Sequence, residues 1–211
     1  MEMNTNQNVE LEEQSTEKKN DGYESFAAFA FDILEMMAWS VLVMVLLFTF
    51  AFRICRVDGP SMENTLFNGQ TLLVRSIGYT PEQEDIIIFH LTDPENNMEK
   101  TLVKRVIATE GQKLEINFYT GEIKVDGVLY PDTHRVLKEP SGMYSIFPDD
   151  IDHYDSYTGI YSITIPENTL FVMGDNRNHS LDSRDEAIGF IDERCVLGKV
   201  ILRFAPFDIL A

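Results

Sequence analysis

The chain has 211 residues and a formal net charge of −18 at pH 7, with 35 Asp and Glu against 17 Lys and Arg. This excess of acid argues against nucleic acid as a partner, because binding to a phosphate backbone depends on clustered Lys and Arg. After a tail and a membrane segment are set aside, the length leaves room for one globular domain with a hydrophobic core and a subdomain.

Cysteine and histidine usage predicts no metal and no cofactor. Cys55 and Cys195 are too far apart in the sequence to indicate a disulfide framework or a redox pair. The four histidines fall at no spacing typical of metal ligands. They are His90, His134, His153 and His179.

The N-terminal part predicts a tail followed by a membrane anchor. Residues 1–24 are rich in Asn, Gln, Glu, Ser and Thr, which is the composition of a disordered acidic tail. Residues 25–54 predict a transmembrane helix, because 36–52 carry no charge until Arg53. At about 1.5 Å per residue this run nearly crosses a hydrocarbon core of about 30 Å, and the apolar residues before it complete the span.

A cleaved signal peptide and a buried core helix are the alternatives for this segment. A signal peptide needs a basic region before the apolar run and a small-residue cleavage site, but the preceding region is acidic and the run ends Phe50-Ala51-Phe52. A core helix of a soluble domain would show a polar face, which is absent. We therefore expect a retained anchor, and the flanking basic residues alone do not settle its orientation.

Residues 55–211 predict a mostly β domain, with antiparallel strands and little helix. Its core is expected at about 55–111 and 160–211, with an inserted β and loop segment at about 112–159. Turns at Thr120-Gly121 and Asp126-Gly127 predict hairpins in the insertion. The expected strands are 71–76, 85–90, 102–108, 114–118, 160–165, 169–173 and 196–204.

Residues 131–155 show no regular pattern and end in an acidic patch. The patch comprises Asp149, Asp150, Asp152 and Asp155. A calcium-binding loop is one interpretation, but the spacing matches no standard site, so we expect a solvated loop.

Three clusters of polar residues follow the anchor. Ser61 comes after the turn formers Gly59 and Pro60, which favours a loop that presents its hydroxyl, although such a sequence alone is typical of an ordinary polar loop. Residues 173–184 form a dense polar loop after an apolar strand, which predicts either a surface turn or a network that orients a catalytic group.

Lys104 lies in the middle of an apolar strand, and strand alternation places it and Arg105 on opposite faces. We expect one of the two cations to face the interior, although an exposed lysine is the more common case. Burial disfavours the ammonium form and lowers the pKa of a lysine from about 10.4, which makes it a usable general base. Arginine cannot serve in this way.

In chain order these clusters resemble bacterial type I signal peptidases of the Gram-positive form. The resemblance covers nearly everything after the anchor except residues 131–155. The segments that carry it are Gly59-Pro60-Ser61-Met62-Glu63-Asn64-Thr65-Leu66, residues 85–89, residues 103–107, Gly174-Asp175-Asn176-Arg177 and Ser180 with Asp182, Ser183 and Arg184.

The resemblance implies an antiparallel β-sheet catalytic domain of the signal peptidase type and a serine endopeptidase that cuts signal peptides from exported preproteins. Ser61 matches the family nucleophile and Lys104 its general base, acting through an acyl-enzyme. The remaining matches are Ser180, which orients the lysine; Asp182 and Arg184, a supporting ion pair; Gly174, a small residue beside the lysine; and Met62 in the substrate groove.

The resemblance also implies a single-pass protein of the cell membrane, with a cytoplasmic N-terminus and an extracytoplasmic catalytic domain. Its partners would be preproteins and the lipid bilayer. The chain departs from the family pattern at Gly59, where some members carry a hydroxyl, at Asn64 in place of proline and at Gln70 in place of aspartate. At the first departure, Gly59 provides no side-chain hydroxyl to act as a second oxyanion donor.

Other functions fit less well. Self-cleaving repressors pair Ser with Lys but need a DNA-binding domain and no anchor, and signal peptidases of the endoplasmic-reticulum type carry histidine at the place of Lys104. The β-lactamase pattern requires lysine three residues after the serine, where this chain has Asn64. The non-enzymatic alternative is a membrane-tethered extracytoplasmic β binding domain.

Overall fold

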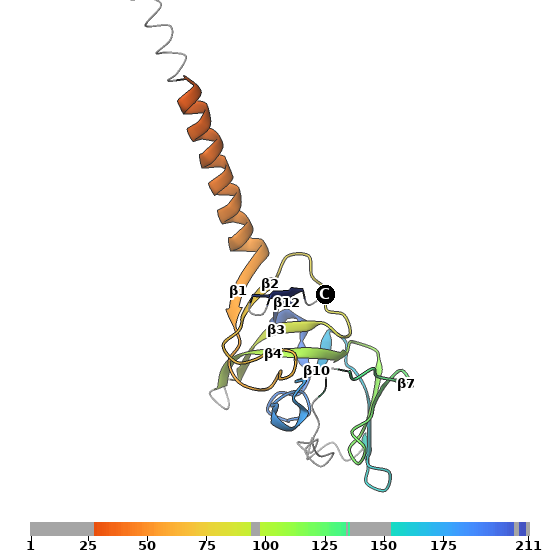
Figure 1. The fold of residues 1–211 in the computed structure, drawn as a ribbon. Coiled ribbons are helices and arrows are strands. Elements are labelled where there is room, and N and C mark those ends of the chain that lie inside the picture. The colour runs from red at the N-terminus through yellow and green to blue at the C-terminus, as the bar shows by residue number, and fades with distance from the viewer. Residues whose placement is uncertain (1–27, 94–97, 134, 136–152, 205–206, 210–211) are drawn as a thin grey trace, which may run out of the picture. The chain divides into compact units, whose positions relative to one another are not determined.

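The computed structural model describes residues 28–93, 98–133, 135, 153–204 and 207–209. They fall into two units, divided between Thr49 and Phe50. The helix Ala28–Ala51 has 24 residues and ends in a π-helical turn, η1 (Leu47–Ala51), drawn in red and orange in Figure 1. It is long and apolar enough to cross a membrane, since 24 residues span about 36 Å. The predicted tail lies outside the described residues.

The helix ends earlier than predicted. Residues 52–54, which the sequence assigned to the anchor, begin strand β1 (Phe52–Arg56), and β1 pairs with β2 (Thr71–Arg75). Phe52 lies opposite Arg75, and Ile54 lies opposite Leu73. Aromatic and β-branched residues suit a strand, and pairing with β2 satisfies their backbone groups, so the apolar run changes from helix to strand at Phe52.

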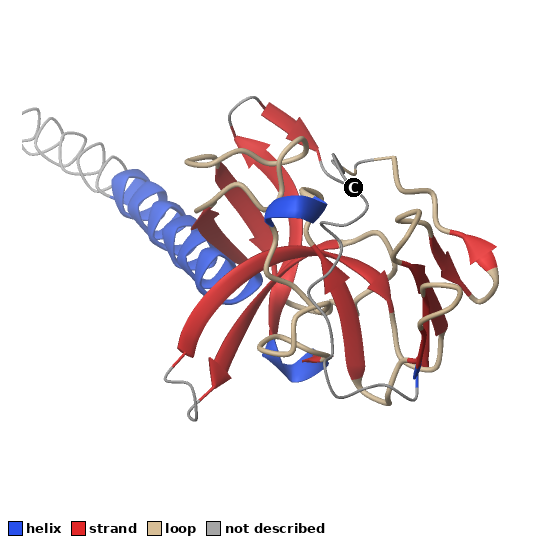
Figure 2. Ribbon diagram, turned by 90° about the horizontal axis from the view of Figure 1, so that it is seen from below, coloured by secondary structure: helices blue, strands red, loops and turns tan. Residues whose placement is uncertain are grey.

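A large antiparallel sheet carries most of the domain (Figures 1 and 2). Its eight strands run in the order β1-β2-β12-β3-β4-β10-β11, and β13 pairs with β12. The remaining bounds are β3 (Ile86–Asp93), β4 (Met98–Ala108), β10 (Thr169–Met173), β11 (Ile191–Asp192), β12 (Val196–Phe204) and β13 (Phe207–Ile209).

A second antiparallel sheet of five strands, which we call the small sheet, runs in the order β7-β6-β5-β9-β8. The predicted hairpins at Thr120-Gly121 and Asp126-Gly127 are confirmed as the links β5–β6 and β6–β7. The bounds are β5 (Lys113–Asn117), β6 (Ile123–Val125), β7 (Val128–Leu129), β8 (Tyr154–Asp155) and β9 (Ile160–Thr164).

The insertion ends later than expected. We placed the return to the core at residue 160, but β9 pairs with β5 along its whole length, from Lys113 opposite Thr164 to Asn117 opposite Ile160. Residues 160–164 therefore belong to the small sheet. The sequence could not show this, because an apolar strand pattern does not specify its partner.

Every predicted strand is present. Strand β1 was missed because its first residues were assigned to the anchor, and β8, β11 and β13 were missed because two or three residues give little pattern. Strands β3 and β4 are longer than predicted, since they pair from Ile86 opposite Arg105 to Asp93 opposite Met98. Three members of the acidic patch, Asp149, Asp150 and Asp152, lie outside the described residues. Asp155 accepts hydrogen bonds from Tyr157 N (2.9 Å) and Thr158 Oγ1 (2.8 Å) in a turn.

Strand β3 is buried on both faces. Ile86 and Ile88 belong to one hydrophobic cluster with Met62, and Ile87 and Phe89 belong to another. Burying a side chain of this size contributes about 1.5–3 kcal/mol. Strand β4 lies beside β3, so its central residues are also enclosed on both faces, and this burial determines the environment of Lys104.

Candidate active site

Ser61 lies on a loop whose two ends are hydrogen-bonded to each other. Val57 N donates to Gln70 O (2.8 Å), and Gly69 N donates to Val57 O (2.9 Å). Gly59 has φ +96°, a left-handed conformation that residues with a Cβ rarely adopt. The glycine that leaves no hydroxyl at this position is therefore the residue that the turn requires.

The turn after the serine is anchored in the core. Leu66 N donates to Met62 O (2.7 Å), and both side chains are buried. Two of the departures from the family pattern, Asn64 and Gln70, lie on the serine loop. Of these two, only Gln70 makes a side-chain hydrogen bond within the part of the chain that the structure describes. The Gln70 side-chain oxygen accepts a hydrogen bond from Phe67 N (2.9 Å). The Asn64 side chain is exposed.

Lys104 and Ser61 are brought together. Lys104 Nζ lies 2.8 Å from Ser61 Oγ, and Lys104 is only 2% exposed. Among the described residues it makes no ion pair. Burial lowers the pKa of Lys104 from 10.5 to about 8; the Asp182 carboxylate opposes this shift and the Arg184 guanidinium adds to it.

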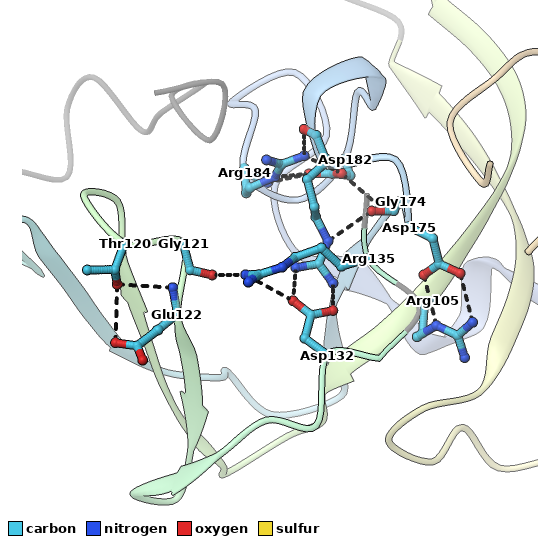
Figure 3. A network of polar contacts seen from close by, with 11 residues as sticks. Arg105, Thr120, Gly121, Glu122, Asp132, Arg135, Gly174, Asp175, Asp182 and Arg184 are labelled. Carbon is cyan, nitrogen blue, oxygen red and sulfur yellow. Dashed lines mark hydrogen bonds and ion pairs between the residues drawn. The ribbon is translucent and has the colours of Figure 1, made fainter. Parts of the chain in front are cut away.

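We expected one of the two neighbouring cations to face the interior, and both do. Arg105 is 6% exposed and forms a bidentate ion pair with Asp175, at 2.9 Å from Nε and 2.8 Å from Nη2 (Figure 3). Alternation was a sound guide to opposite faces, but β4 is enclosed on both of them.

Asp175 joins the loop of the serine to the strand of the lysine. Besides Arg105, its carboxylate accepts a 2.5 Å hydrogen bond from Thr65 Oγ1, four residues after Ser61. Arg105 Nη1 also donates to Glu84 O (2.8 Å). One buried carboxylate thus holds a neighbour of each member of the pair.

Asp182 and Arg184 form the buried ion pair that the resemblance implied. Arg184 Nε lies 2.8 Å from Asp182 Oδ1, and Arg184 Nη2 lies 2.9 Å from Oδ2. Gly174 N donates to Asp182 Oδ2 (2.9 Å). Although burial opposes ionisation, Arg184 lowers the pKa of Asp182, so the carboxylate stays charged beside the site.

Gly174 is required by space. A Cβ built on it would overlap Ser180 Oγ and the Ser61 carbonyl oxygen. The Ser180 hydroxyl is buried and makes no hydrogen bond of normal geometry to any residue that the structure describes, although it is near enough to Asp182 to help lower the pKa of that carboxyl. The structure contains no Ser180–Lys104 hydrogen bond, and an orienting role for Ser180 stays a prediction.

Asn176 holds the serine loop from the other side. Its backbone N donates to Ser61 O (3.0 Å), and its side-chain Nδ2 donates to Pro60 O (3.1 Å). Sequence reasoning placed Asn176 and Asp175 in the motif but gave neither a role. The available signal was their presence in a polar loop directly after a buried strand, which names no partner.

A small pocket opens beside the pair. It has a volume of about 110 Å³ and includes Ser61, Met62 and Lys104 in its lining. The rest of the lining comes from the β1 end of the serine loop and from β3 and β4: Cys55, Arg56, Val57, Asp58, Ile88, Thr101, Leu102 and Val103. Met62 belongs to the pocket lining, and its role in a substrate groove stays a prediction.

Comparison with known proteins agrees with this geometry. Residues 30–205 match the family described as signal peptidase, peptidase S26. The chain belongs to this family. The peptidase is 31% identical over 186 residues to signal peptidase IB of Staphylococcus aureus (strain COL), covering 84% of this chain and 92% of that one. It is also 31% identical over 157 residues to a probable signal peptidase I-1 of Synechocystis sp., covering 71% and 69%.

Among solved structures, the peptidase resembles a crystal structure of a signal peptidase I from Enterococcus faecalis V583, with 25% identity and a TM-score of 0.37 over 57% of this chain and 97% of that one. Family membership makes the protein a peptidase that cleaves signal peptides, so preproteins that carry them are its substrates. The mostly β, antiparallel fold with one N-terminal apolar helix is as predicted.

Proposed function

We propose that the peptidase cleaves preproteins with Ser61 as nucleophile and Lys104 as general base. Neutral Lys104 takes the proton of Ser61, the serine oxygen attacks the scissile carbonyl carbon, and the tetrahedral intermediate collapses to an acyl-enzyme. The protonated lysine gives its proton to the departing amine. Lys104 then activates a water that hydrolyses the ester, which releases the new carboxylate and restores Ser61.

The observation that carries this proposal is the 2.8 Å contact between Lys104 Nζ and Ser61 Oγ, made by a lysine whose pKa burial lowers to about 8. At pH 8 about half of such a base is neutral, whereas a lysine with a pKa of 10.5 would be neutral in only about 0.3% of molecules. The backbone N–H of Ser61 is the proposed oxyanion donor, because Gly59 offers no side chain.

The pocket supports binding of an extended substrate. Strand β10 pairs with β4 only over Arg105–Ala108, so within the described structure the β4 residues 101–104 that line the pocket have no strand partner on that edge. An extended segment can add to such an edge through main-chain hydrogen bonds and direct one side chain into the pocket. The pocket volume of about 110 Å³ favours a small residue before the cut.

The decisive experiment is cleavage of a preprotein by purified, membrane-reconstituted protein, with product masses locating the cut. Ser61→Ala and Lys104→Ala are expected to be folded and inactive. Lys124→Ala, which changes an exposed lysine of the small sheet, is the matched control and should keep full activity. Full activity in Ser61→Ala would contradict the proposal and favour another nucleophile. Full activity in Lys104→Ala would contradict it and favour another base.

The helix Ala28–Ala51 is proposed to anchor the peptidase with a cytoplasmic N-terminus and an extracytoplasmic catalytic domain. In that arrangement the domain acts on the side of the membrane where exported chains emerge. Protease added outside intact cells, after permeabilisation of any outer layer, should digest the domain. Digestion only after lysis of the membrane would reverse the assigned orientation.

A further inference from the structure

Three pairs of guanidinium and carboxylate groups hold residues 174–184, which we call the catalytic loop. Two of them, Arg105–Asp175 and Arg184–Asp182, lie directly around the dyad. The third, Arg177–Asp132, is different, because its carboxylate comes from the segment that follows β7 of the small sheet. Asp132 belongs to residues 131–155, which show no regular sequence pattern.

Arg177 is 1% exposed, and each of the three nitrogens of its guanidinium donates a hydrogen bond. Nη1 and Nη2 each lie 2.7 Å from an oxygen of Asp132, and Nε donates to Gly174 O (3.0 Å). The Arg177 carbonyl accepts a hydrogen bond from Arg184 Nη2 (2.8 Å). Arg177 therefore fixes both Gly174 and the second ion pair of the catalytic loop.

Asp132 is held on its other side by the small sheet. Arg135 Nη1 lies 3.5 Å from Asp132 Oδ2 and donates to the carbonyl of Gly121 in the β5–β6 hairpin turn. Figure 3 shows the line of contacts from Gly121 through Arg135 to Asp132, and on toward Gly174. Ion pairs and hydrogen bonds thereby connect the small sheet to Gly174, which packs against Ser61.

Gly174 has little freedom to move without moving the nucleophile. Its Cα faces Ser180 Oγ and the Ser61 carbonyl so closely that a methyl group would not fit, and its N–H is bound to Asp182. Its carbonyl oxygen is the atom that Arg177 holds. Without the carboxylate of Asp132, the buried Arg177 would have to seek another partner, because a buried charge without a countercharge is strongly unfavourable.

We propose that Asp132 is a positioning residue for the peptidase reaction, acting through Arg177 to hold Gly174 against Ser61 and Ser180. The inference rests on the proposed function of Ser61 and Lys104. It assigns the small sheet a part in catalysis although Asp132 is absent from the lining of the pocket beside the dyad. A displacement of about 1 Å at a reacting centre can cost about 100-fold in rate. Loss of the ion pair between Asp132 and Arg177 can therefore slow the reaction measurably.

The test compares Asp132→Asn with Asp192→Asn in the full-length, membrane-reconstituted protein. Asp192 also pairs with an arginine, Arg194, at 2.6 Å, but that arginine is exposed, and Asp192 lies on β11, outside the catalytic loop. We expect Asp132→Asn to lower kcat by about 10- to 100-fold with KM changed less than about 2-fold. Asp192→Asn should match the parent in both.

A purely structural role would reduce the amount of folded enzyme and leave the pH profile of the remaining activity unchanged. A positioning role predicts that the pH at which kcat/KM reaches half its maximum moves upward, because a loosened loop admits water to Lys104. An unchanged kcat and pH profile in folded Asp132→Asn overturns the inference.

Arg177→Lys gives an independent test if Asp132→Asn does not fold. It keeps the positive charge but cannot bind Asp132 with two nitrogens while also holding Gly174 O. We expect a loss of kcat similar to that predicted for Asp132→Asn. Parental kcat in folded Arg177→Lys overturns the inference.

Ser61→Ala, measured in the same preparation, separates the two claims. If Ser61→Ala is inactive and Asp132→Asn is unaffected, only the positioning role fails. If Ser61→Ala is active, the proposed dyad fails first.

Discussion

The surroundings of Lys104 and those of Arg105 differ in one respect that decides their chemistry. Both cations lie on β4 and both are nearly inaccessible, at 2% and 6% exposure. Arg105 meets the carboxylate of Asp175 at 2.8 Å, and the pKa of its guanidinium is raised despite burial. Lys104 meets a hydroxyl, and the pKa of its amine falls to about 8.

Burial therefore has opposite consequences at adjacent positions. Where a carboxylate is present, as at Arg105, the side chain stays charged and forms a fixed ion pair. Where none of the described carboxylates makes an ion pair, as at Lys104, the charged form is disfavoured, which suits the residue to its proposed role as a base. A shift from 10.5 to about 8 corresponds to a free-energy cost of about 3 kcal/mol for holding the charged form of Lys104 in the folded protein.

The largest effect is expected when the base of this comparison is replaced by a residue that cannot deprotonate. Lys104→Arg keeps the charge and much of the length, yet should lower kcat by at least about 1000-fold, because arginine stays protonated with a pKa above about 12. Single-turnover cleavage of a preprotein measures the loss. Residual activity within about 10-fold of the parent would show that no neutral base is needed at this position.

Removing the ion pair between Arg105 and Asp175 should lower the stability of the fold strongly. Asp175→Asn leaves the buried Arg105 with only the more distant Glu84 carboxylate, at 3.9 Å, and weakens the contact to Thr65, so we expect the free energy of unfolding to fall by about 3–5 kcal/mol. Urea denaturation of the detergent-solubilised protein measures it. Asp192→Asn, at an exposed pair, should change stability by less than about 1 kcal/mol. If Asp175→Asn and Asp192→Asn lowered the free energy of unfolding equally, burial would not be what makes the Arg105–Asp175 pair important to stability.

The cost of burying Lys104 predicts that an apolar replacement stabilises the fold. Lys104→Met should raise the free energy of unfolding by about 1–3 kcal/mol at pH 7 while abolishing cleavage. The folded pKa of about 8 lies below the ordinary value of 10.5, so the penalty is fully present below pH 8 and declines between these two values. The gain measured by urea denaturation should therefore shrink as pH rises from 8 toward 10.5. A gain that does not depend on pH would point to packing instead.

The smallest effect on stability is expected at Ser180. Ser180→Ala should alter the free energy of unfolding by less than about 0.5 kcal/mol, because its hydroxyl gives up no hydrogen bond of normal geometry. A fall in kcat at unchanged stability would support the orienting role that the resemblance implies. Parental kcat in this variant would argue that Lys104 is oriented by its contact with Ser61 and by packing alone.

The sequence was sufficient for the parts that depend on local pattern. Short β-branched and apolar runs between turn formers predicted the strands that became β2, β4, β10 and β12, and turn chemistry predicted both hairpins of the small sheet. Family motifs predicted that Ser61 and Lys104 meet, 43 positions apart. These features follow from residue types at fixed spacing.

What escaped prediction depends on long-range contacts. The pairing of Phe52 with Arg75 that ends the helix, the return of the chain after Thr164 and the ion pair of Asp132 with Arg177 each join segments that carry no mutual signal in one sequence. The burial of Arg105 was missed for the same reason, because whether a strand is enclosed on both faces depends on its neighbours.

The most direct test of the central claim is the pH dependence of kcat/KM for cleavage of a preprotein, which reports the pKa of the essential base in the free enzyme. The burial of Lys104, which has no ion pair among the described residues, predicts that log kcat/KM rises with unit slope, bends near pH 8 and is flat above it. A profile that is already flat from about pH 6, or that keeps rising toward pH 10.5, would contradict a lysine base tuned by burial.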